Sequence, residues 1–116
     1  MPTFTKKLLS GSANGKPIII ADTGVSGTLI HTAIGGTSDM DEVWIWATNL
    51  LGAQAALTIE YGSIETGSQI ISAIPAQQGL YLTIPGLILQ NSLEIRAYTD
   101  PASGVCVQGF VNRITA

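Results

Sequence analysis

Apolar and polar side chains alternate at every second position in four short runs of the chain. The runs cover residues 43–48, 57–61, 80–84 and 93–98. Because successive side chains of a β-strand point to opposite faces, this period predicts antiparallel strands with one face in a core and one in solvent. In the fourth run, Glu94 and Arg96 are expected side by side on the wet face. The predicted inward side chains of the other three runs are Val43, Ile45, Ala47, Leu57, Ile59, Tyr61, Leu80, Leu82 and Ile84.

Five further runs have the composition of strands, namely residues 4–9, 17–21, 28–33, 69–74 and 105–114. Turn signals separate the runs at Asn14-Gly15, at Pro85-Gly86, and in segments 75–79 and 100–104. Residues 49–57 contain helix formers, but a glycine interrupts them, and we expect a loop with at most one helical turn. About nine short strands with a turn every 8–12 residues predict an all-β fold, an antiparallel β-sandwich or jelly roll. We expect one domain over residues 1–116, in which residues 1–9 form an N-terminal arm or edge strand.

Charged residues make up only 11% of the 116-residue chain, whereas about 25% is usual in soluble domains. A sandwich has two outer faces, and five basic plus eight acidic side chains cover them thinly. Either neighbouring chains cover part of this surface, as in a homo-oligomer, or hydroxyl and backbone groups solvate a small monomer. We favour the covered surface.

The distribution of charge argues against nucleic acid as a partner, and the lengths of the apolar runs argue against a membrane. The net charge is −3, and the basic residues are scattered, apart from the adjacent Lys6 and Lys7. Nucleic-acid binding needs clustered lysine and arginine against the phosphates. No apolar run reaches the roughly 18 residues of a transmembrane helix, and the apolar segment after Lys7 is too short for a signal peptide. The single cysteine, Cys106, permits no disulfide framework or thiolate metal cage, and we expect it to be a small buried side chain.

Candidate catalytic residues are sparse. Ser26, His31 and Asp39 are the residue types of a Ser-His-Asp catalytic triad, but their spacing does not match such a motif. We expect His31 to be a half-buried strand residue. Asp39, Asp41 and Glu42 form the one acidic cluster, which lacks the spacing of a calcium loop and is interpreted as a solvated turn. The sequence contains no phosphate-binding glycine motif. We therefore expect a protein that is not an enzyme and that has no cofactor or metal site.

Trp44 and Trp46 lie on one face of a predicted strand whose other face is already apolar. Such a strand is either central in a buried sheet or part of a subunit interface. A pair of tryptophans on a sheet also forms a platform on which a sugar ring can stack, and Tyr81 would be its third aromatic residue. We favour core or interface, and keep a glycan- or receptor-binding platform of these three residues as the alternative.

Several segments of the chain resemble small virion proteins of tailed bacteriophages. These segments are DEVWIWATN at residues 41–49, LTIEYG at 57–62, IPAQQGLYLTIPGL at 74–87, LEIRAY at 93–98 and QGFVNRI at 108–114. The likeness runs from about Thr5 to Ile114 and is one of strand and turn patterning, without a catalytic signature.

The resemblance implies a head decoration, or cement, protein that binds the outside of an expanded capsid, often as a trimer. The implied partners are the major capsid protein and further copies of the chain. The implied location is the capsid surface of the virion, after synthesis in the host cytoplasm. A tail, neck or fibre subunit has the same patterning and stays an alternative. From their apolarity and position, the predicted contact residues are Pro2, Thr3, Phe4, Thr5, Leu50 and Leu51.

Overall fold

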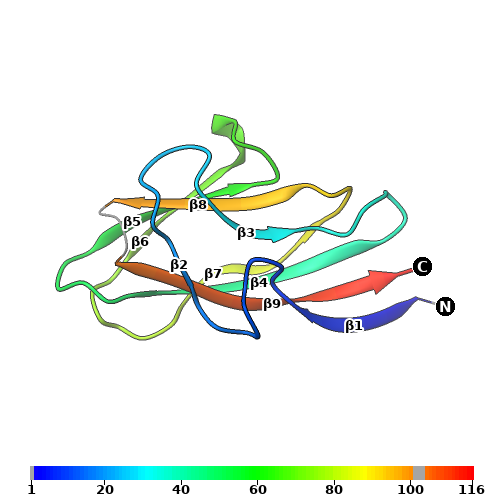
Figure 1. The fold of residues 1–116 in the computed structure, drawn as a ribbon, viewed down its shortest axis with the longest axis horizontal. Coiled ribbons are helices and arrows are strands. Elements are labelled where there is room, and N and C mark those ends of the chain that lie inside the picture. The colour runs from blue at the N-terminus through cyan, green and yellow to red at the C-terminus, as the bar shows by residue number, and fades with distance from the viewer. Residues whose placement is uncertain (1, 101–103) are drawn as a thin grey trace.

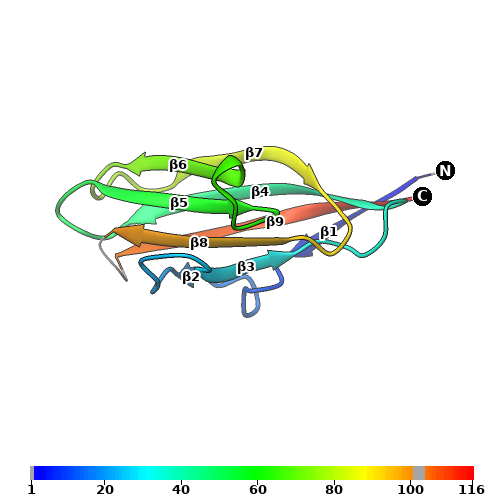
Figure 2. The ribbon, with the colours of Figure 1, turned by 90° about the horizontal axis from the view of Figure 1, so that it is seen from above.

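The computed structural model describes residues 2–100 and 104–116, which form two antiparallel β-sheets stacked face to face (Figures 1 and 2). Sheet A contains β1 (Thr3–Leu8), β2 (Ile18–Ile19), β4 (Met40–Asn49), β7 (Tyr81–Leu89) and β9 (Val105–Thr115). Sheet B contains β3 (Thr28–Thr32), β5 (Ala55–Tyr61), β6 (Gln69–Ile74) and β8 (Glu94–Asp100). The helical structure in this part of the chain is one short 3-10 turn, η1 (Thr66–Ser68), on a loop above sheet B.

The strand order is that of a jelly roll. Sheet A runs β1-β9-β4-β7 and sheet B runs β3-β8-β5-β6. Strands β1 and β2 both pair with β9, at residues 110–115 and 106–107 respectively, so they act as two parts of one interrupted first strand. The pairs β1/β2–β9, β3–β8, β4–β7 and β5–β6 then nest inside one another, which is the topology of two joined Greek keys. The predicted all-β sandwich is confirmed, and the predicted arm at residues 1–9 is an edge strand from Thr3 to Leu8.

The core lies between the sheets and is built from the predicted inward positions of β4 and β5. Val43, Ile45 and Ala47 from sheet A meet Leu57 and Ile59 from sheet B, and all five are fully buried. Buried residues of the neighbouring strands complete this core, among them Ile20, Ile30, Ile74, Ile84, Ile95, Val105, Val107 and Val111. Cys106 is buried as expected, and burial raises the pKa of its thiol.

One irregularity in β7 overturns part of the predicted inward set. Ile45 pairs with Ile84 but Trp46 pairs with Leu82, so one extra residue lies between the two pairs as a β-bulge. Ile84 faces the core as predicted, whereas the prediction for Leu80 and Leu82 is wrong, because both are exposed on the far side of the sheet. A bulge reverses the direction of every side chain beyond it, and alternation in the sequence carries no sign of it.

The predicted turns and loops have different outcomes in the structure. Pro85 and Gly86, predicted as a turn, lie inside β7 at a second register shift, between the pairs Val43–Leu87 and Trp44–Pro85. An edge strand tolerates a proline there because its free edge needs no amide donor. The predicted loop after β4 is confirmed, and β5 begins at Ala55. The predicted turn at 100–104 falls mostly on residues 101–103, which lie outside the described residues.

Candidate functional site

His31 belongs to a buried polar network rather than to a half-buried strand surface. A register shift separates it from Leu29, so His31 points between the sheets and is only 1% exposed. The Ser10 amide donates to His31 Nδ1 at 2.9 Å, so Nδ1 carries no proton and Nε2 donates to Asp41 Oδ2 at 2.8 Å. Arg113 donates from Nε to Asp41 Oδ1 at 2.8 Å and from Nη2 to Oδ2 at 3.0 Å. Both ring nitrogens are therefore occupied, and the network ties β3, β4 and β9 together.

The candidate catalytic and metal-binding residues are not brought together. Asp39 accepts a hydrogen bond from the Ala116 amide at 2.8 Å, and Ser26 is exposed in a loop. Burial raises the pKa of Asp41, but the hydrogen bonds from Arg113 and His31 outweigh it and leave the pKa below its usual value. Within residues 2–100 and 104–116, no group of three or more His, Cys, Asp and Glu side chains is arranged to hold a metal ion. The acidic cluster is thus neither a solvated turn nor a cation site, because its members point in different directions.

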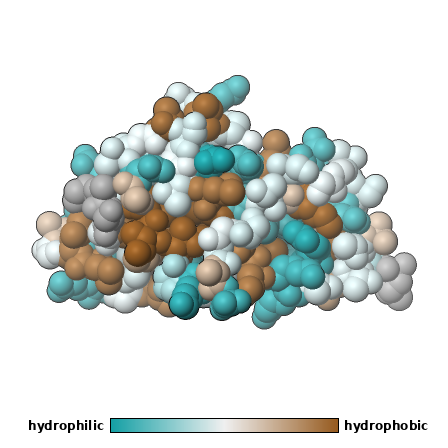
Figure 3. Space-filling model, viewed as in Figure 1, coloured by the Kyte–Doolittle hydropathy of each residue, from teal (hydrophilic) through white to brown (hydrophobic). Residues whose placement is uncertain are grey.

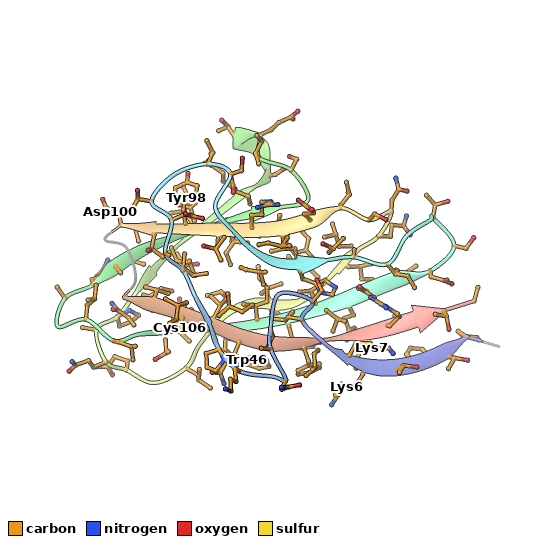
Figure 4. All side chains as sticks on the ribbon, viewed as in Figure 1. Lys6, Lys7, Trp46, Tyr98, Asp100 and Cys106 are labelled. Carbon is orange, nitrogen blue, oxygen red and sulfur yellow. The ribbon has the colours of Figure 1, made fainter. Side chains whose placement is uncertain are left out.

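Three aromatic rings form a continuous patch on the outer face of sheet A, the side turned away from sheet B. The centroids of Trp44 and Trp46 are 6.3 Å apart, and Phe110 on β9 lies 6.4 Å and 6.0 Å from them. The planes of the three rings differ by 17° to 30°. Lys6 Nζ lies 4.6 Å from the centroid of Phe110, a cation–π contact. Figure 4 shows Trp46 and Lys6 on this side of the molecule.

Trp44 is held in place by its neighbours on the sheet. Its Nε1 donates to Glu42 Oε1 at 2.9 Å, and the same oxygen accepts from Asn112 Nδ2 at 2.9 Å. These two hydrogen bonds, from Asn112 first and then from Trp44, lower the pKa of Glu42. The indole also lies against Gly86, where a Cβ atom would come within 2.8 Å of Trp44 Cζ2. The second bulge of β7, with Gly86 at a φ of +82°, therefore makes room for the ring.

Exposed aliphatic side chains extend the aromatic patch across sheet A. Leu82 pairs with Trp46, Leu8 pairs with Phe110 and Ile88 pairs with Glu42, so all three share the outer face. A shallow hollow of about 340 Å³ lies over Trp46 and Phe110, with Leu80 in its wall. We call this surface, made of Leu8, Trp44, Trp46, Leu80, Leu82, Ile88 and Phe110, the aromatic face. The edge of the sandwich at β2 and β3 carries further apolar surface (Figure 3).

The structure corrects the predicted aromatic platform in one member. Tyr81 pairs with Ala47, whose side chain points into the core, so Tyr81 lies on the opposite side of sheet A from the two tryptophans. The bulge beside Leu82 is the cause. Phe110 takes the third place instead. Alternation in residues 105–114 puts Phe110 on one face of a strand, but no signal in the sequence shows that this strand pairs with β4.

The predicted contact residues lie at opposite ends of sheet A. At one end, Thr3 pairs with Thr115, and all six residues of β1 are exposed. At the other end, Asn49 pairs with Val105 and the next residue, Leu50, is exposed. Ten strand residues of about 3.4 Å each separate the two ends, a span of about 34 Å. Leu51 is partly covered and packs closely on Gly104, while Pro2, Thr3, Phe4 and Thr5 are all exposed.

Nothing in the described part of the chain is a helix long and apolar enough to cross a membrane. Comparison of the chain with protein-family models, with curated proteins and with solved structures found no match. The function has to be inferred from the surface itself.

Proposed function

We propose that this chain is a structural subunit that forms a homo-oligomer through its aromatic face, and whose specific role is to decorate the outside of a viral capsid. The observation that carries the proposal is the aromatic face itself, with two tryptophans, a phenylalanine and four exposed aliphatic side chains on one side of one sheet. Tryptophan is the residue most enriched among those that dominate binding energy at protein interfaces.

The charged side chains beside the aromatic face already make contacts within the chain. Glu42 accepts hydrogen bonds from Trp44 and Asn112, and Lys6 lies over Phe110. Covering this face with another subunit would therefore bury apolar surface together with a carboxylate that already accepts two hydrogen bonds. Burial of apolar surface contributes roughly 25 cal/mol per Å², whereas an unpaired buried charge would cost several kcal/mol.

A second copy of the chain is a suitable occupant for the aromatic face. The face carries both a hollow of about 340 Å³ and protruding apolar side chains, Leu8 and Phe4, on the adjoining strand. A symmetric contact between copies needs one surface to supply both partners of each contact. The net charge of −3 gives only weak repulsion between copies.

The capsid-decorating role rests on the resemblance to phage virion proteins and is supported by two observations. The jelly roll occurs in viral capsid and lectin domains, although a fold alone does not fix a function. In addition, the exposed Phe4 and Leu50 lie near opposite ends of sheet A, about 34 Å apart by strand length. A subunit with a contact at each end can bridge two neighbouring capsomers and oppose their separation.

The role is tested by co-sedimentation with expanded capsid shells, with unexpanded shells alongside. We expect saturable binding to expanded shells only. Deleting residues 2–5 should weaken binding while leaving the fold intact, because β1 is an exposed edge strand outside the core. Leu50→Ser should weaken binding at the other end, and Ile71→Ser, an exposed control on the outer face of sheet B, should not. Failure to bind either shell would remove the decoration role and favour a tail, neck or fibre subunit.

A glycan platform is the second candidate, because the hollow places Gln108 beside the rings of Trp46 and Phe110. Sugar rings stack on aromatic faces and hydrogen-bond to amide side chains. The two candidates differ in the state of the tryptophans. In an assembled interface they are shielded from acrylamide, whereas in a glycan site they are quenched in the free protein and protected by the ligand.

A further inference from the structure

Glu60 is a buried carboxylate that receives no hydrogen bond from the described part of the chain. The residue lies on β5 between the core positions of Ile59 and the strand end, and alternation points its side chain to the outer side of sheet B. It is nevertheless only 1% exposed. Among the described residues, neither of its carboxylate oxygens has a hydrogen-bond partner. Burying an ionised carboxylate costs free energy unless a hydrogen-bond donor or a cation pairs with it. Glu60 is therefore a candidate ligand-binding residue.

Neighbouring side chains cover Glu60 without pairing with it. Its cross-strand neighbours are Gln69 on β6 and Arg96 on β8. Gln69 Nε2 donates to the Tyr98 hydroxyl at 3.2 Å, and because β5 lies between β6 and β8, this bond passes over the outer side of β5. Figure 4 shows Tyr98 on the upper side of β8, away from sheet A.

Arg96, the cationic cross-strand neighbour of Glu60, hydrogen-bonds to other groups. Arg96 Nε donates to Glu94 Oε1 at 3.0 Å, and its Nη1 donates to the Gly27 carbonyl at 3.1 Å. The Glu94–Arg96 pair that the sequence predicts side by side therefore exists, and Arg96 makes no hydrogen bond to Glu60. The charged groups at this position are thus the guanidinium of Arg96 and the carboxylates of Glu60 and Glu94.

A hollow of about 230 Å³ opens at this point, and Glu60 is one of its lining residues. Glu94 and Arg96 line it from β8, while Ser63 and Ile64 line it from the loop that carries η1. Leu93, from the turn before β8, adds a second apolar side chain. The loop stands up from sheet B at this end (Figure 1), and its tip carries apolar surface (Figure 3). The hollow thus combines a residue whose two buried carboxylate oxygens lack hydrogen bonds with two apolar side chains in a largely polar lining.

We propose that this hollow binds a guanidinium group on a short aliphatic stem. Two parallel N–H groups of a guanidinium match the two free oxygens of a carboxylate, and such charge-assisted pairs are among the strongest hydrogen bonds in proteins. Ile64 and Leu93 would contact the stem, and the incoming charge balances the second carboxylate. A divalent metal is a poorer fit, because the hollow offers two carboxylates beside a fixed Arg96. The guanidinium belongs either to a small molecule or to an arginine of a partner protein.

The test is an NMR titration of the full-length, ¹⁵N-labelled protein with ethylguanidinium, with its neutral isostere ethylurea alongside. We expect saturable shifts of the Gly62, Ser63 and Leu93 amides with ethylguanidinium and none with ethylurea. Glu60→Gln should weaken binding at least about tenfold, because it removes one charge-assisted pair. Glu65→Gln, which removes a charge from the same loop outside the hollow, should bind as the wild type does.

Equal shifts with ethylurea, no saturable shift with ethylguanidinium, or unchanged binding by a folded Glu60→Gln variant would overturn the proposal. The ethylurea comparison uses wild-type protein alone, so it holds even if the variant folds poorly. A capped arginine amide separates the two sources. If the capped amide binds as tightly as ethylguanidinium, the result supports a partner's side chain. If the capped amide is excluded, the result supports a small molecule. Both results keep the guanidinium as the bound group. Because the hollow lies on sheet B, these results do not depend on the aromatic face.

Discussion

The outer faces of the two sheets are built from the same alternating pattern but differ in how their polar groups are satisfied. On sheet A, the outward Glu42 accepts hydrogen bonds from Asn112 and Trp44, and the surface around it is aromatic. On sheet B, the outward Glu60 has no partner among the described residues, and the surface around it carries the Glu94–Arg96 pair. The carboxylate on the first face is satisfied within the chain, whereas the described part of the chain gives the carboxylate on the second face no hydrogen bond.

The pKa directions of the two glutamates express this difference. Hydrogen bonds from Asn112 and Trp44 lower the pKa of Glu42. Burial raises the pKa of Glu60, and the positive charge of Arg96 only partly opposes it. The pKa values of two outward carboxylates on one small sandwich therefore shift in opposite directions, because Glu42 accepts two hydrogen bonds whereas Glu60 is buried without one.

The largest expected effect separates the faces by their part in assembly. Trp46→Ala on sheet A should weaken self-association by at least about 2 kcal/mol, or about 30-fold, as expected for an aromatic residue at the centre of an interface. Tyr98→Ala, the matched aromatic truncation on sheet B, should leave self-association unchanged. Sedimentation equilibrium of both variants measures the difference. Equal weakening by the two variants would break the comparison.

The next effect concerns how sheet A accommodates Trp44. Gly86→Ala should lower the free energy of unfolding by about 2–3 kcal/mol, because the new Cβ meets the indole and the backbone has a positive φ. Gly79→Ala has a similar φ of +76° but no atom within 4 Å, and should cost only about 1 kcal/mol. Urea denaturation followed by tryptophan fluorescence gives both values. If the two costs are equal, Gly86 is needed for its backbone conformation alone.

On sheet B, pH should reveal the unpaired carboxylate. A raised folded-state pKa means that the stability linked to Glu60 is fully present below about pH 4.5 and is lost as pH rises through the folded pKa. Glu60→Gln mimics the protonated form, so it should be about 1–2 kcal/mol more stable than the wild type at pH 7. The gain should vanish below pH 4.5. Asp41, whose pKa is lowered, contributes in the opposite sense in both proteins and cancels in their difference. A stability gain independent of pH would show that Glu60 is not the titrating group.

The smallest effect is the cation over Phe110. Lys6→Gln should cost about 0.5 kcal/mol of stability, the usual value for an exposed cation–π contact. Lys7→Gln is the matched control, because Lys7 pairs with the inward-facing Val111 and lies on the other side of β1. Thermal unfolding of the two variants in parallel resolves the difference. If both variants lose the same stability, the loss is due to the removal of a positive charge and not to the contact with the Phe110 ring.

Much of the fold follows from the alternation of apolar and polar residues. The predictions that fail depend on pairing between distant strands or on β-bulges. Val43, Ile45 and Ala47 are predicted inward and are buried, because β4 runs straight through sheet A. Leu82 and Tyr81 are misplaced because an extra residue in β7 reverses the side chains before Ile84. A bulge changes the partner strand's register, and a single sequence gives no sign of that register.

The candidate sites were only partly predictable. The sequence indicates that Trp44 and Trp46 share a face, but the third ring, Phe110, comes from a strand more than sixty residues away. Alternation also places Glu60 outward, yet its burial depends on Gln69 and Tyr98 joining across β5. Both features arise from strand pairing, which depends on the whole chain.

The most direct test of the central claim is sedimentation velocity of the wild type, Leu82→Ser and Ile71→Ser over a range of concentrations. Leu82 and Ile71 are both exposed aliphatic residues, at 41% and 67%, on the outer faces of sheets A and B respectively. We expect the wild type and Ile71→Ser to form the same discrete oligomer, and Leu82→Ser to sediment as a folded monomer at concentrations where they assemble. A monomeric wild type, or an oligomer lost equally in both variants, would contradict assembly through the aromatic face.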